Sequence, residues 1–351
     1  MTDLDQRIVH TLRERAEGAV DTDRLMAGAV NRGRARVRRR RATAGAALSV
    51  VALLGVGVAV GSVHLGGSEQ DGVVPADQAA GVVVRAVPPR ADGVPGAAAR
   101  PDLVGADAGV LHFGFAPSGP RYLNWSVQDG VERAELDVGG RTITLELAAS
   151  ADALHRSAQG VTGMVPESLR NGAFDGSVTR DEGLNGVPIW LRRWQPVPGV
   201  YARASVLAKE QRDLFDVAAA LRLNEAYQCG GPLRLSALPA GARITGCEVS
   251  TERLPTEVTV VLTVARTTVP GLQVELGYAA VTESRTKGNW TIDGIPAYRQ
   301  PQGGYLELLG FPKAHLTANF GSPYQGFTEA DAAAVLGAAQ VAEHLDQPAT
   351  W

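Results

Sequence analysis

The sequence predicts an α+β protein: a single transmembrane helix followed by a linker and two tandem repeats of antiparallel sheet, each with a C-terminal helix. Three observations lead to this prediction. An uncharged run of 22 residues follows an Arg-rich segment, a stretch rich in Pro and Gly comes next, and two similar series of strand-like segments then each end in an Ala-rich run.

The charge of the chain is unevenly distributed. Its 351 residues include 34 basic and 37 acidic side chains, for a net charge of −3. Residues 1–41 hold eleven Arg and six acidic residues, a net charge of +5, whereas residues 64–351 have a net charge of −8. With 45% hydrophobic and 20% charged residues, the composition excludes a disordered chain, and the length suffices for about two domains.

The uncharged run, residues 42–63, has the length of a membrane-spanning helix. As a helix it would be about 33 Å long, enough to cross the hydrocarbon core of a bilayer. The basic residues before it predict a cytoplasmic N-terminus and an extracytoplasmic C-terminal domain, and so a single-pass protein of the cell membrane. Two alternatives stay open: a signal peptide cleaved near Ala59-Val60-Gly61, and a buried core helix. The topogenic residues are Arg38, Arg39, Arg40 and Arg41.

Residues 1–41 form the predicted cytoplasmic segment, which is too short for a core of its own. Leu4, Ile8 and Leu12 recur at helical spacing, and we expect this apolar stripe to bind a cytoplasmic partner or the lipid bilayer. Nucleic acid is not an expected partner, because the Arg run adjoins the predicted bilayer and contains no aromatic residue.

Residues 64–104 are predicted to be a flexible linker. Gly66-Gly67, Pro88-Pro89 and Pro101 are typical of a segment that cannot bury enough apolar surface to fold by itself.

Residues 105–227 and 228–351 are predicted to be two copies of one extracytoplasmic unit. Both contain an Asn or Asp followed by Gly, an apolar residue and Pro, beginning at Asn185 and at Asp293. Such Asn-Gly and Asp-Gly pairs favour hairpin turns. The strand-like segments are residues 121–127, 131–138, 141–147 and 200–207 in the first unit, and 243–250, 257–265, 272–278, 305–309 and 315–320 in the second.

Each predicted unit closes with an Ala-rich helix, at residues 213–223 and 329–345. The second helix opens with Thr328-Glu329-Ala330-Asp331, a capping-box pattern that predicts a sharp helix start.

Cys229 and Cys247 are the two cysteines of the chain, and both lie on the predicted outer side. We expect them to form a disulfide in an oxidising compartment, at the junction of the two units. Closing this loop would contribute on the order of 3 kcal/mol in the chain-entropy model.

The sequence contains no motif that predicts catalysis or metal binding. The six His show no HExxH arrangement, and neither a GxSxG elbow nor a GxxxxGK[ST] phosphate loop occurs. The one SxxK sequence, Ser284 to Lys287, lacks the companion motifs of an acyl-enzyme. We therefore expect no enzyme, no metal and no cofactor.

Several aromatic residues lie near the repeated turns and predict a groove for a hydrophobic ligand or a partner peptide. The alternative for the same side chains is core or interdomain packing. They are Trp190, Tyr201, Trp290, Tyr298 and Tyr305.

The turn at residues 293–298 and the capped Ala-rich helix from Thr328, with the entry segments 232–235 and 238–241, resemble the extracytoplasmic domain of bacterial membrane-anchored regulators of the anti-sigma type. The resemblance covers residues 231–345 and extends to 108–223, and it implies strands followed by a final helix. One feature departs from the family. Residues 1–41 contain one His and no Cys, so they lack the ligands of a zinc-containing sigma-binding domain.

These observations predict a membrane-anchored, non-enzymatic protein of the bacterial envelope that binds a ligand or a partner protein through its duplicated ectodomain. The alternative is a transmembrane regulator of the anti-sigma type, whose cytoplasmic helix engages a sigma factor. An envelope enzyme is the third reading, and it would require acidic or His side chains that converge in space.

Overall fold

The computed structural model describes residues 84–116, 118–157, 172–182, 186–267, 271–281, 283–321 and 326–351. The chain divides into two compact units, residues 1–77 and 78–351, and all described residues belong to the second. The predicted cytoplasmic segment and the predicted span at 42–63 lie outside the described residues.

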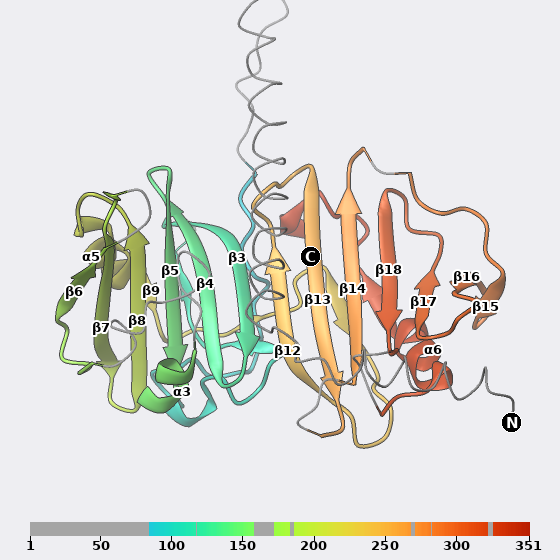
Figure 1. Cartoon of the computed structure of the whole chain (residues 1–351), viewed down its shortest axis with the longest axis horizontal. Helices are drawn as coiled ribbons and strands as arrows, with labels where there is room; N and C mark the ends of the chain where they lie inside the picture. The colour runs from blue at the N-terminus through green and yellow to red at the C-terminus, as the bar shows by residue number, and fades with distance from the viewer. Residues whose placement is uncertain are drawn as a thin grey trace, which may run out of the picture. The chain divides into compact units, whose positions relative to one another are not determined.

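Thirteen of the described strands form one antiparallel sheet in the order β15-β16-β17-β18-β14-β13-β12-β3-β4-β5-β8-β7-β6 (Figure 1). We call the strands β3, β4, β5, β8, β7 and β6 the first half of the sheet. The strands β12, β13, β14, β18, β17, β16 and β15 form the second half. The bounds are β3 Arg121–Gln128, β4 Val131–Val138, β5 Arg141–Ala148, β6 Val178–Asp181, β7 Ile189–Val197, β8 Val200–Leu207, β12 Arg243–Ser250, β13 Glu257–Ala265, β14 Leu272–Ala279, β15 Trp290–Ile292, β16 Ile295–Arg299, β17 Tyr305–Leu308 and β18 Ala314–Asn319.

The two halves join edge to edge, because β3 and β12 pair antiparallel over five residues of each strand, from Gly246↔Gln128 to Ser250↔Asn124. Each half begins with a three-stranded meander, and a later strand, β8 or β18, returns beside the third strand of that meander. Outward from the junction, the strands of the two halves are therefore arranged in a similar order. The boundaries 105–227 and 228–351 of the two repeats stay a prediction.

Short elements complete the described residues. In both halves a short strand after the closing helix pairs with one that precedes the first strand of the meander: β9 with β2, and β19 with β11. The bounds are η1 Pro101–Leu103, β1 Val110–Leu111, β2 Gly114–Phe115, α3 Ala151–Arg156, α5 Arg212–Ala220, β9 Leu221–Arg222, β10 Tyr227–Gln228, β11 Leu233–Leu235, α6 Glu329–Gly337, β19 Ala339–Val341 and η3 Pro348–Thr350.

The sheet has two unlike faces, because successive side chains of a strand point to opposite sides. The core face carries the alternating Val, Leu, Ile and Ala residues of the strands, and α5 and α6 pack on it through Leu214, Val217, Val335 and Leu336. The opposite face, which we call the polar face, carries mostly Thr, Ser, Asn, Gln, Arg and Glu. On this face α3 packs through Leu154 in a small apolar cluster with Val131, Ala148, Ala153, Phe174 and Tyr201.

The predicted strands are present, and several have the predicted bounds, such as Val131–Val138 and Glu257–Ala265. The hairpin turn predicted at Asp293-Gly294 is confirmed as well, since both residues have positive φ, 50° and 82°. Strand prediction succeeds here because the alternation of apolar and polar residues is a local signal.

The predicted α+β class is wrong. One large antiparallel sheet dominates the described residues, and their helices are short, with six residues in α3 and nine each in α5 and α6. The helix predicted to run to Leu345 ends at Gly337, because residues 339–341 instead pair with β11 as β19. Neither α5 nor α6 ends its half of the fold, since a strand follows each.

The structure also corrects the predicted location. In the part of the chain that the structure describes, no helix combines the length and the apolar character needed to cross a membrane. The predicted transmembrane helix and the single-pass cell-membrane location, with a cytoplasmic N-terminus and an extracytoplasmic C-terminal domain, therefore find no support in the described residues, and the predicted span itself lies outside them.

The described part of the predicted linker packs on the folded unit. Ala86, Ala91 and Ala97 are buried, and the Ala97 and Ala98 backbone N–H groups donate to the carbonyls of His112 and Leu223 at 2.8 Å. Residues 84–104 are therefore not a free tether in this structure.

Candidate functional site

A row of side chains crosses the polar face at right angles to the strands, each member paired with the next on the neighbouring strand. Its charged members are acidic in the second half of the sheet, whereas three of four are Arg in the first half. The row thus has opposite net charge on the two sides of the β3–β12 junction. From end to end, the row is Glu307, Thr317, Glu275, Val261, Glu248, Ser126, Arg133, Glu146, Arg203 and Arg193.

Two adjoining hollows open on this row beside the junction. They have volumes of about 460 and about 50 Å³ and share Ser126, Gln128 and Arg133, so they form one continuous groove, which we call the junction groove. The larger hollow lies between the strands and the C-terminal turn of α3. Its other lining residues are Asp129, Val131, Glu146, Ala153, Arg156 and Ser157, and those of the smaller hollow are Asn124, Trp125, Glu135 and Glu248.

The wall formed by α3 is fixed to the sheet by a buried ion pair. Arg203 Nε donates to Glu146 Oε2 at 2.7 Å, and both side chains are 1% exposed. The other guanidinium nitrogens of Arg203 donate to the carbonyls of Leu154 and Ser157, at 2.8 and 3.2 Å. Ser157 Oγ donates to Glu146 Oε1 at 2.9 Å. Burial raises the pKa of Glu146, although the charge of Arg203 and these hydrogen bonds act in the opposite direction.

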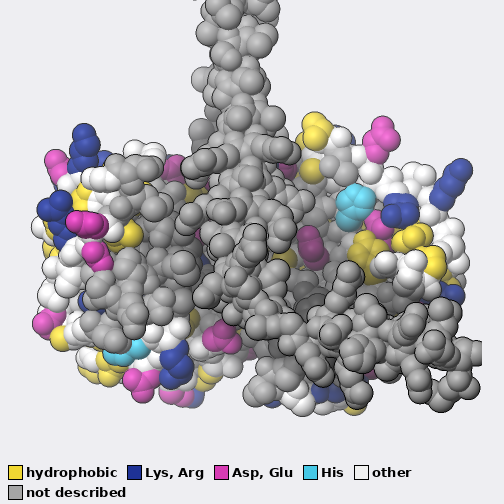
Figure 2. All heavy atoms as spheres, viewed as in Figure 1, with side chains coloured by type: hydrophobic (Ala, Val, Ile, Leu, Met, Phe, Trp, Pro, Cys, Tyr) yellow, Lys and Arg dark blue, Asp and Glu magenta, His cyan; other side chains and the backbone are white. Residues whose placement is uncertain are grey.

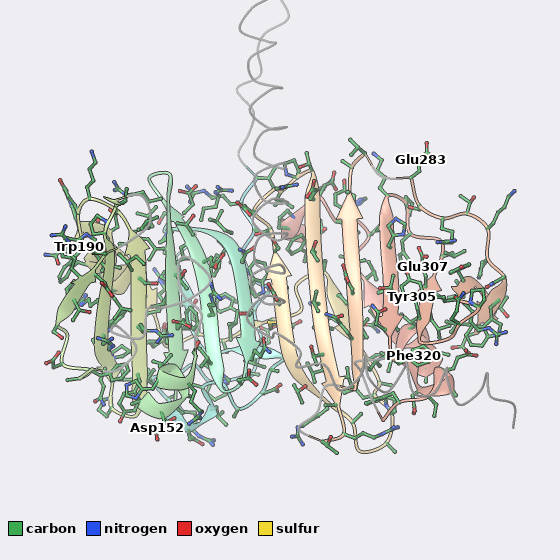
Figure 3. The ribbon with its side chains drawn as sticks, in the orientation of Figure 1. Asp152, Trp190, Glu283, Tyr305, Glu307 and Phe320 are labelled. Carbon is green, nitrogen blue, oxygen red and sulfur yellow. A yellow bond between two sulfur atoms is a disulfide. The ribbon has the colours of Figure 1, made fainter. Side chains whose placement is uncertain are left out.

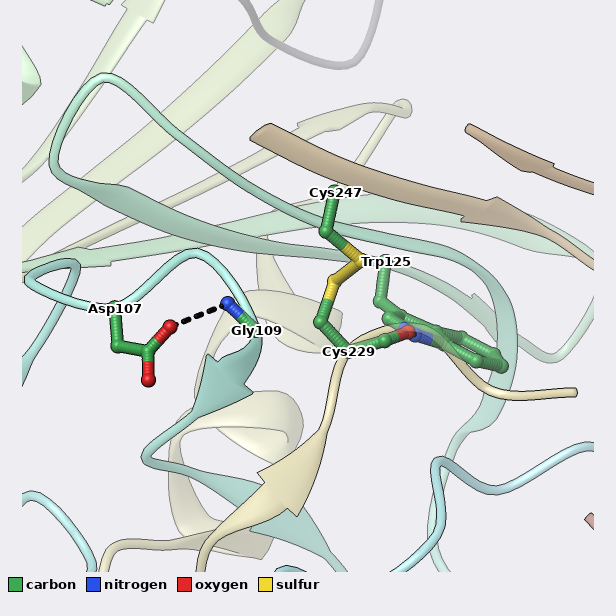
Figure 4. The surroundings of a disulfide bond; sticks show 5 residues. All are labelled: Asp107, Gly109, Trp125, Cys229 and Cys247. Atoms are coloured by element: carbon green, nitrogen blue, oxygen red, sulfur yellow. Dashed lines mark hydrogen bonds between the residues drawn. A yellow bond between two sulfur atoms is a disulfide. The ribbon is translucent and has the colours of Figure 1, made fainter. Parts of the chain in front are cut away.

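The floor of the junction groove rests on a rigid base on the core face. Cys229 and Cys247 form the predicted disulfide, which joins the end of the first half to β12 (Figure 4). The prediction of this disulfide is confirmed. Trp125 lies beside it, 1% exposed, and its indole Nε1 donates to the Cys229 carbonyl at 2.6 Å. The backbone of β3 that lines the groove is therefore constrained by contacts on the core face of the sheet.

Unbalanced charges remain at the rim of the groove. Arg133 forms an ion pair with Glu135, and Glu146 pairs with Arg203. Arg156 on α3 and Asp129 in the β3–β4 turn are exposed, and neither has an ion-pair or hydrogen-bond partner among the described residues. The larger hollow is therefore lined by one cation and one carboxylate that have no partner among the described residues.

A second polar cluster lies in the other half of the sheet, around the buried carboxylate of Glu307. His315 Nδ1 lies 2.6 Å from Glu307 Oε1, and Arg285 Nε donates to Oε2 at 3.0 Å. Figure 3 labels Glu307 and Tyr305 on β17, and Figure 2 shows basic, acidic and His side chains gathered over β18 and the strands beside it. Burial and the charge of Glu307 raise the pKa of Tyr305 to about 12. Because every acceptor oxygen of Glu307 is occupied, we interpret the cluster as structural.

Arg193 adds a buried positive charge to the first half of the polar face. It is 2% exposed, and its Nε and Nη2 have no hydrogen-bond partner among the described residues. Burial, followed by the neighbouring charge of Arg203, lowers its pKa.

The aromatic residues predicted to line one groove lie at the two ends of the sheet. Trp190 and Tyr201 are on adjacent strands of the first half, where Trp190 Nε1 donates to the Ala208 carbonyl at 3.0 Å. Trp290, Tyr298 and Tyr305 are on β15, β16 and β17, at the opposite end of the sheet. Figure 3 labels Trp190 and Tyr305 at the two ends. The structure separates the two sets and divides each of them between the two faces. Trp190 and Trp290 pack against the core cluster, whereas Tyr201 packs beside Phe174 on the polar face. Tyr298 and Tyr305 lie beside Arg285 and Glu307, so the single aromatic groove that the sequence predicted is not formed.

The remaining predicted sites lie elsewhere or stay predictions. Leu4, Ile8 and Leu12, and the Arg run 38–41, are outside the described residues, so binding of a cytoplasmic partner there is untested. Within the described ranges no three His, Cys, Asp or Glu side chains come together as metal ligands. The expectations of no enzyme activity, no metal and no cofactor stay predictions.

Sequence reasoning missed the junction groove. Ser126 and Arg133 lie in the predicted strands 121–127 and 131–138, and Gln128 directly follows the first of them, but alternation along a strand indicates only which of its residues share a face. The missing information was that β3 pairs with β12 and that α3 folds over the same face, and no local pattern carries it.

A scan against protein-family models gives no match, and a comparison with curated proteins gives none either. Among solved structures, the chain matches the one titled "Crystal structure of MucB in complex with MucA(peri)" at 10% identity, over 69% of this chain and 71% of that chain. The TM-score of this match is 0.21, and a likeness at that level supports no conclusion about fold or function.

Proposed function

We propose that the protein is a non-enzymatic binding protein that holds an extended segment of a partner polypeptide in the junction groove. The observation that carries this proposal is the pair of adjoining hollows on the polar face, lined by hydroxyl, amide and charged groups beside the β3–β12 junction.

The spacing of the groove residues suits an extended polypeptide. Asn124, Ser126 and Gln128 are alternate residues of β3, so their side chains repeat at about 7 Å along the groove. An extended peptide that lies beside them repeats its own side chains at the same interval. Hydroxyl and amide groups along such a line can bind the peptide backbone directly or through water.

The base below the groove favours binding without rearrangement. The disulfide and the hydrogen bond from Trp125 constrain β3 and β12, and Arg203 constrains α3. When a peptide binds to a groove that is already ordered, less conformational entropy is lost, so the free energy of binding is more favourable. In the finer form of the proposal, which the motif at residues 293–298 supports, the partner is a protein of the bacterial envelope and the chain is a regulator of the anti-sigma type.

The test is a selection with phage-displayed random dodecapeptides, using the full chain with its disulfide intact. We expect enriched peptides that also bind as free synthetic peptides. Gln128 is exposed in the groove, so Gln128→Trp should fill it and weaken binding by about tenfold or more. The matched control is Gln302→Trp, at an exposed position in the turn between β16 and β17, which should bind normally. Absence of any enriched peptide, or equal binding by Gln128→Trp, would overturn the proposal.

A further inference from the structure

We propose that the junction groove selects partner segments that place an acidic side chain against Arg156 and a basic side chain against Asp129. This inference rests on the proposed function and specifies the chemistry of the partner.

Arg156 is the unbalanced cation of the groove. Of the two Arg that line the groove, Arg133 is paired with Glu135, whereas Arg156 has no carboxylate partner among the described residues. A guanidinium that is exposed at the rim of a hollow can form two parallel hydrogen bonds with a carboxylate. An acidic side chain of the partner would therefore balance a charge that the described residues leave open.

The backbone that carries Arg156 is held in place by contacts on both sides of this residue. Ser150 caps the N-terminus of α3 by accepting from the Ala153 backbone N–H. Arg203 binds the carbonyls of Leu154 and Ser157, on either side of Arg156 in the sequence. The backbone around Arg156 is thus tied to the sheet at Leu154 and Ser157, so a partner that pairs with Arg156 meets a backbone that is already ordered.

Asp129 supplies the opposite charge in the lining of the same hollow. It occupies the β3–β4 turn with Gly130, at φ values of 53° and 78°, a tight hairpin geometry that holds it at the end of the groove. Glu248, which lines the smaller hollow, also has no ion-pair partner among the described residues. A partner with an acidic residue facing α3 and basic residues toward the two carboxylates matches this arrangement.

The test uses the peptides that the phage selection yields, synthesised with amidated C-termini so that only side-chain carboxylates are present. We expect Arg156→Glu to weaken binding of these peptides by about tenfold. Replacing the acidic residue of the peptide by Lys should weaken binding to the unaltered chain by a similar factor and should restore binding to Arg156→Glu. The matched control, Arg212→Glu on the exposed start of α5, should bind as the unaltered chain does.

The results separate the two proposals. If peptides bind but carry no acidic residue, or bind Arg156→Glu as tightly as the unaltered chain, the inference about charge is overturned and the binding function stands. If the charge-reversed peptide fails to rescue Arg156→Glu, the inference is also overturned, because loss of binding alone could reflect a disturbed α3. If no peptide binds at all, both proposals fail.

Discussion

At the scale of the residue, the ion pair between Glu146 and Arg203 connects the sheet to the wall of the groove. Both groups are buried, and Arg203 also binds two carbonyl groups at the C-terminal end of α3. Such a pair gives little net stability compared with apolar residues, but removal of one partner leaves the other buried and uncompensated. The pair therefore matters chiefly for where α3 lies.

The residue-scale prediction concerns Arg203→Met. This variant leaves the Glu146 carboxylate buried without its ion-pair partner, with the hydrogen bond from Ser157 and the neighbouring charge of Arg133 remaining, so we expect the free energy of unfolding to fall by about 3 kcal/mol. Urea denaturation followed by Trp fluorescence measures it. In the double variant Glu146→Leu with Arg203→Met, most of this loss should be recovered, because neither charge of the pair remains buried. Equal stability of the single variant and the unaltered chain would show that the pair is not desolvated.

At the scale of the element, α6 shows how a local motif gives a helix a defined start. Thr328 Oγ1 accepts from the Asp331 backbone N–H, and the Asp331 carboxylate accepts from the Thr328 backbone N–H, which confirms the predicted capping box. Arg266 Nη2 also donates to Asp331, at 2.8 Å. The bond from Arg266, with those from Thr328, lowers the pKa of Asp331 to about 2.

The element-scale prediction is a pH dependence. The pKa of Asp331 is lower in the folded chain than its ordinary value of 3.8, so its ionised form stabilises the fold above that pH. This stability is lost as the pH falls from about 4 toward 2, and after allowance for solvent screening it amounts to about 1 kcal/mol. In Asp331→Asn the free energy of unfolding should fall less steeply over this range. Parallel curves for the two proteins would contradict the prediction.

At the scale of the whole molecule, the two halves of the sheet depend on one pairing, that of β3 with β12. The disulfide between Cys229 and Cys247, separated by 18 positions, lies directly behind this pairing. In the unfolded state the disulfide closes a loop and so lowers the conformational entropy of the chain at the junction. This is the main way in which a disulfide stabilises a fold in the chain-entropy model.

The whole-molecule prediction is that Cys229→Ala with Cys247→Ala lowers the free energy of unfolding by about 3 kcal/mol. The far-UV circular dichroism should be unchanged at 25 °C, because the ladder of β3 with β12 remains. Denaturation of the unaltered chain with and without a reducing agent gives the control, and the reduced chain should match the double variant. Identical midpoints for all samples would show that the disulfide does not constrain the junction.

Features that depend on residues close together in the sequence could be predicted, whereas features that depend on distant residues could not. Strands such as Val131–Val138 followed from alternation, the turn at Asp293 from residues that tolerate positive φ, and the start of α6 from its capping box. The end of α6 at Gly337 did not follow, since an Ala-rich run favours a helix until a distant strand, β11, competes for its backbone.

The sequence by itself therefore determined which segments are strands, which side of each strand is apolar, and which two cysteines pair, because these depend on near neighbours or on a choice with one solution. Only the tertiary structure decided that the two sets of strands join as a single sheet and that Arg156 and Asp129 line one groove. Both outcomes depend on which strand edges meet and on how α3 folds back over the polar face. A strand's pattern of side chains specifies its faces, whereas its edges consist of backbone groups that are alike in every residue except proline.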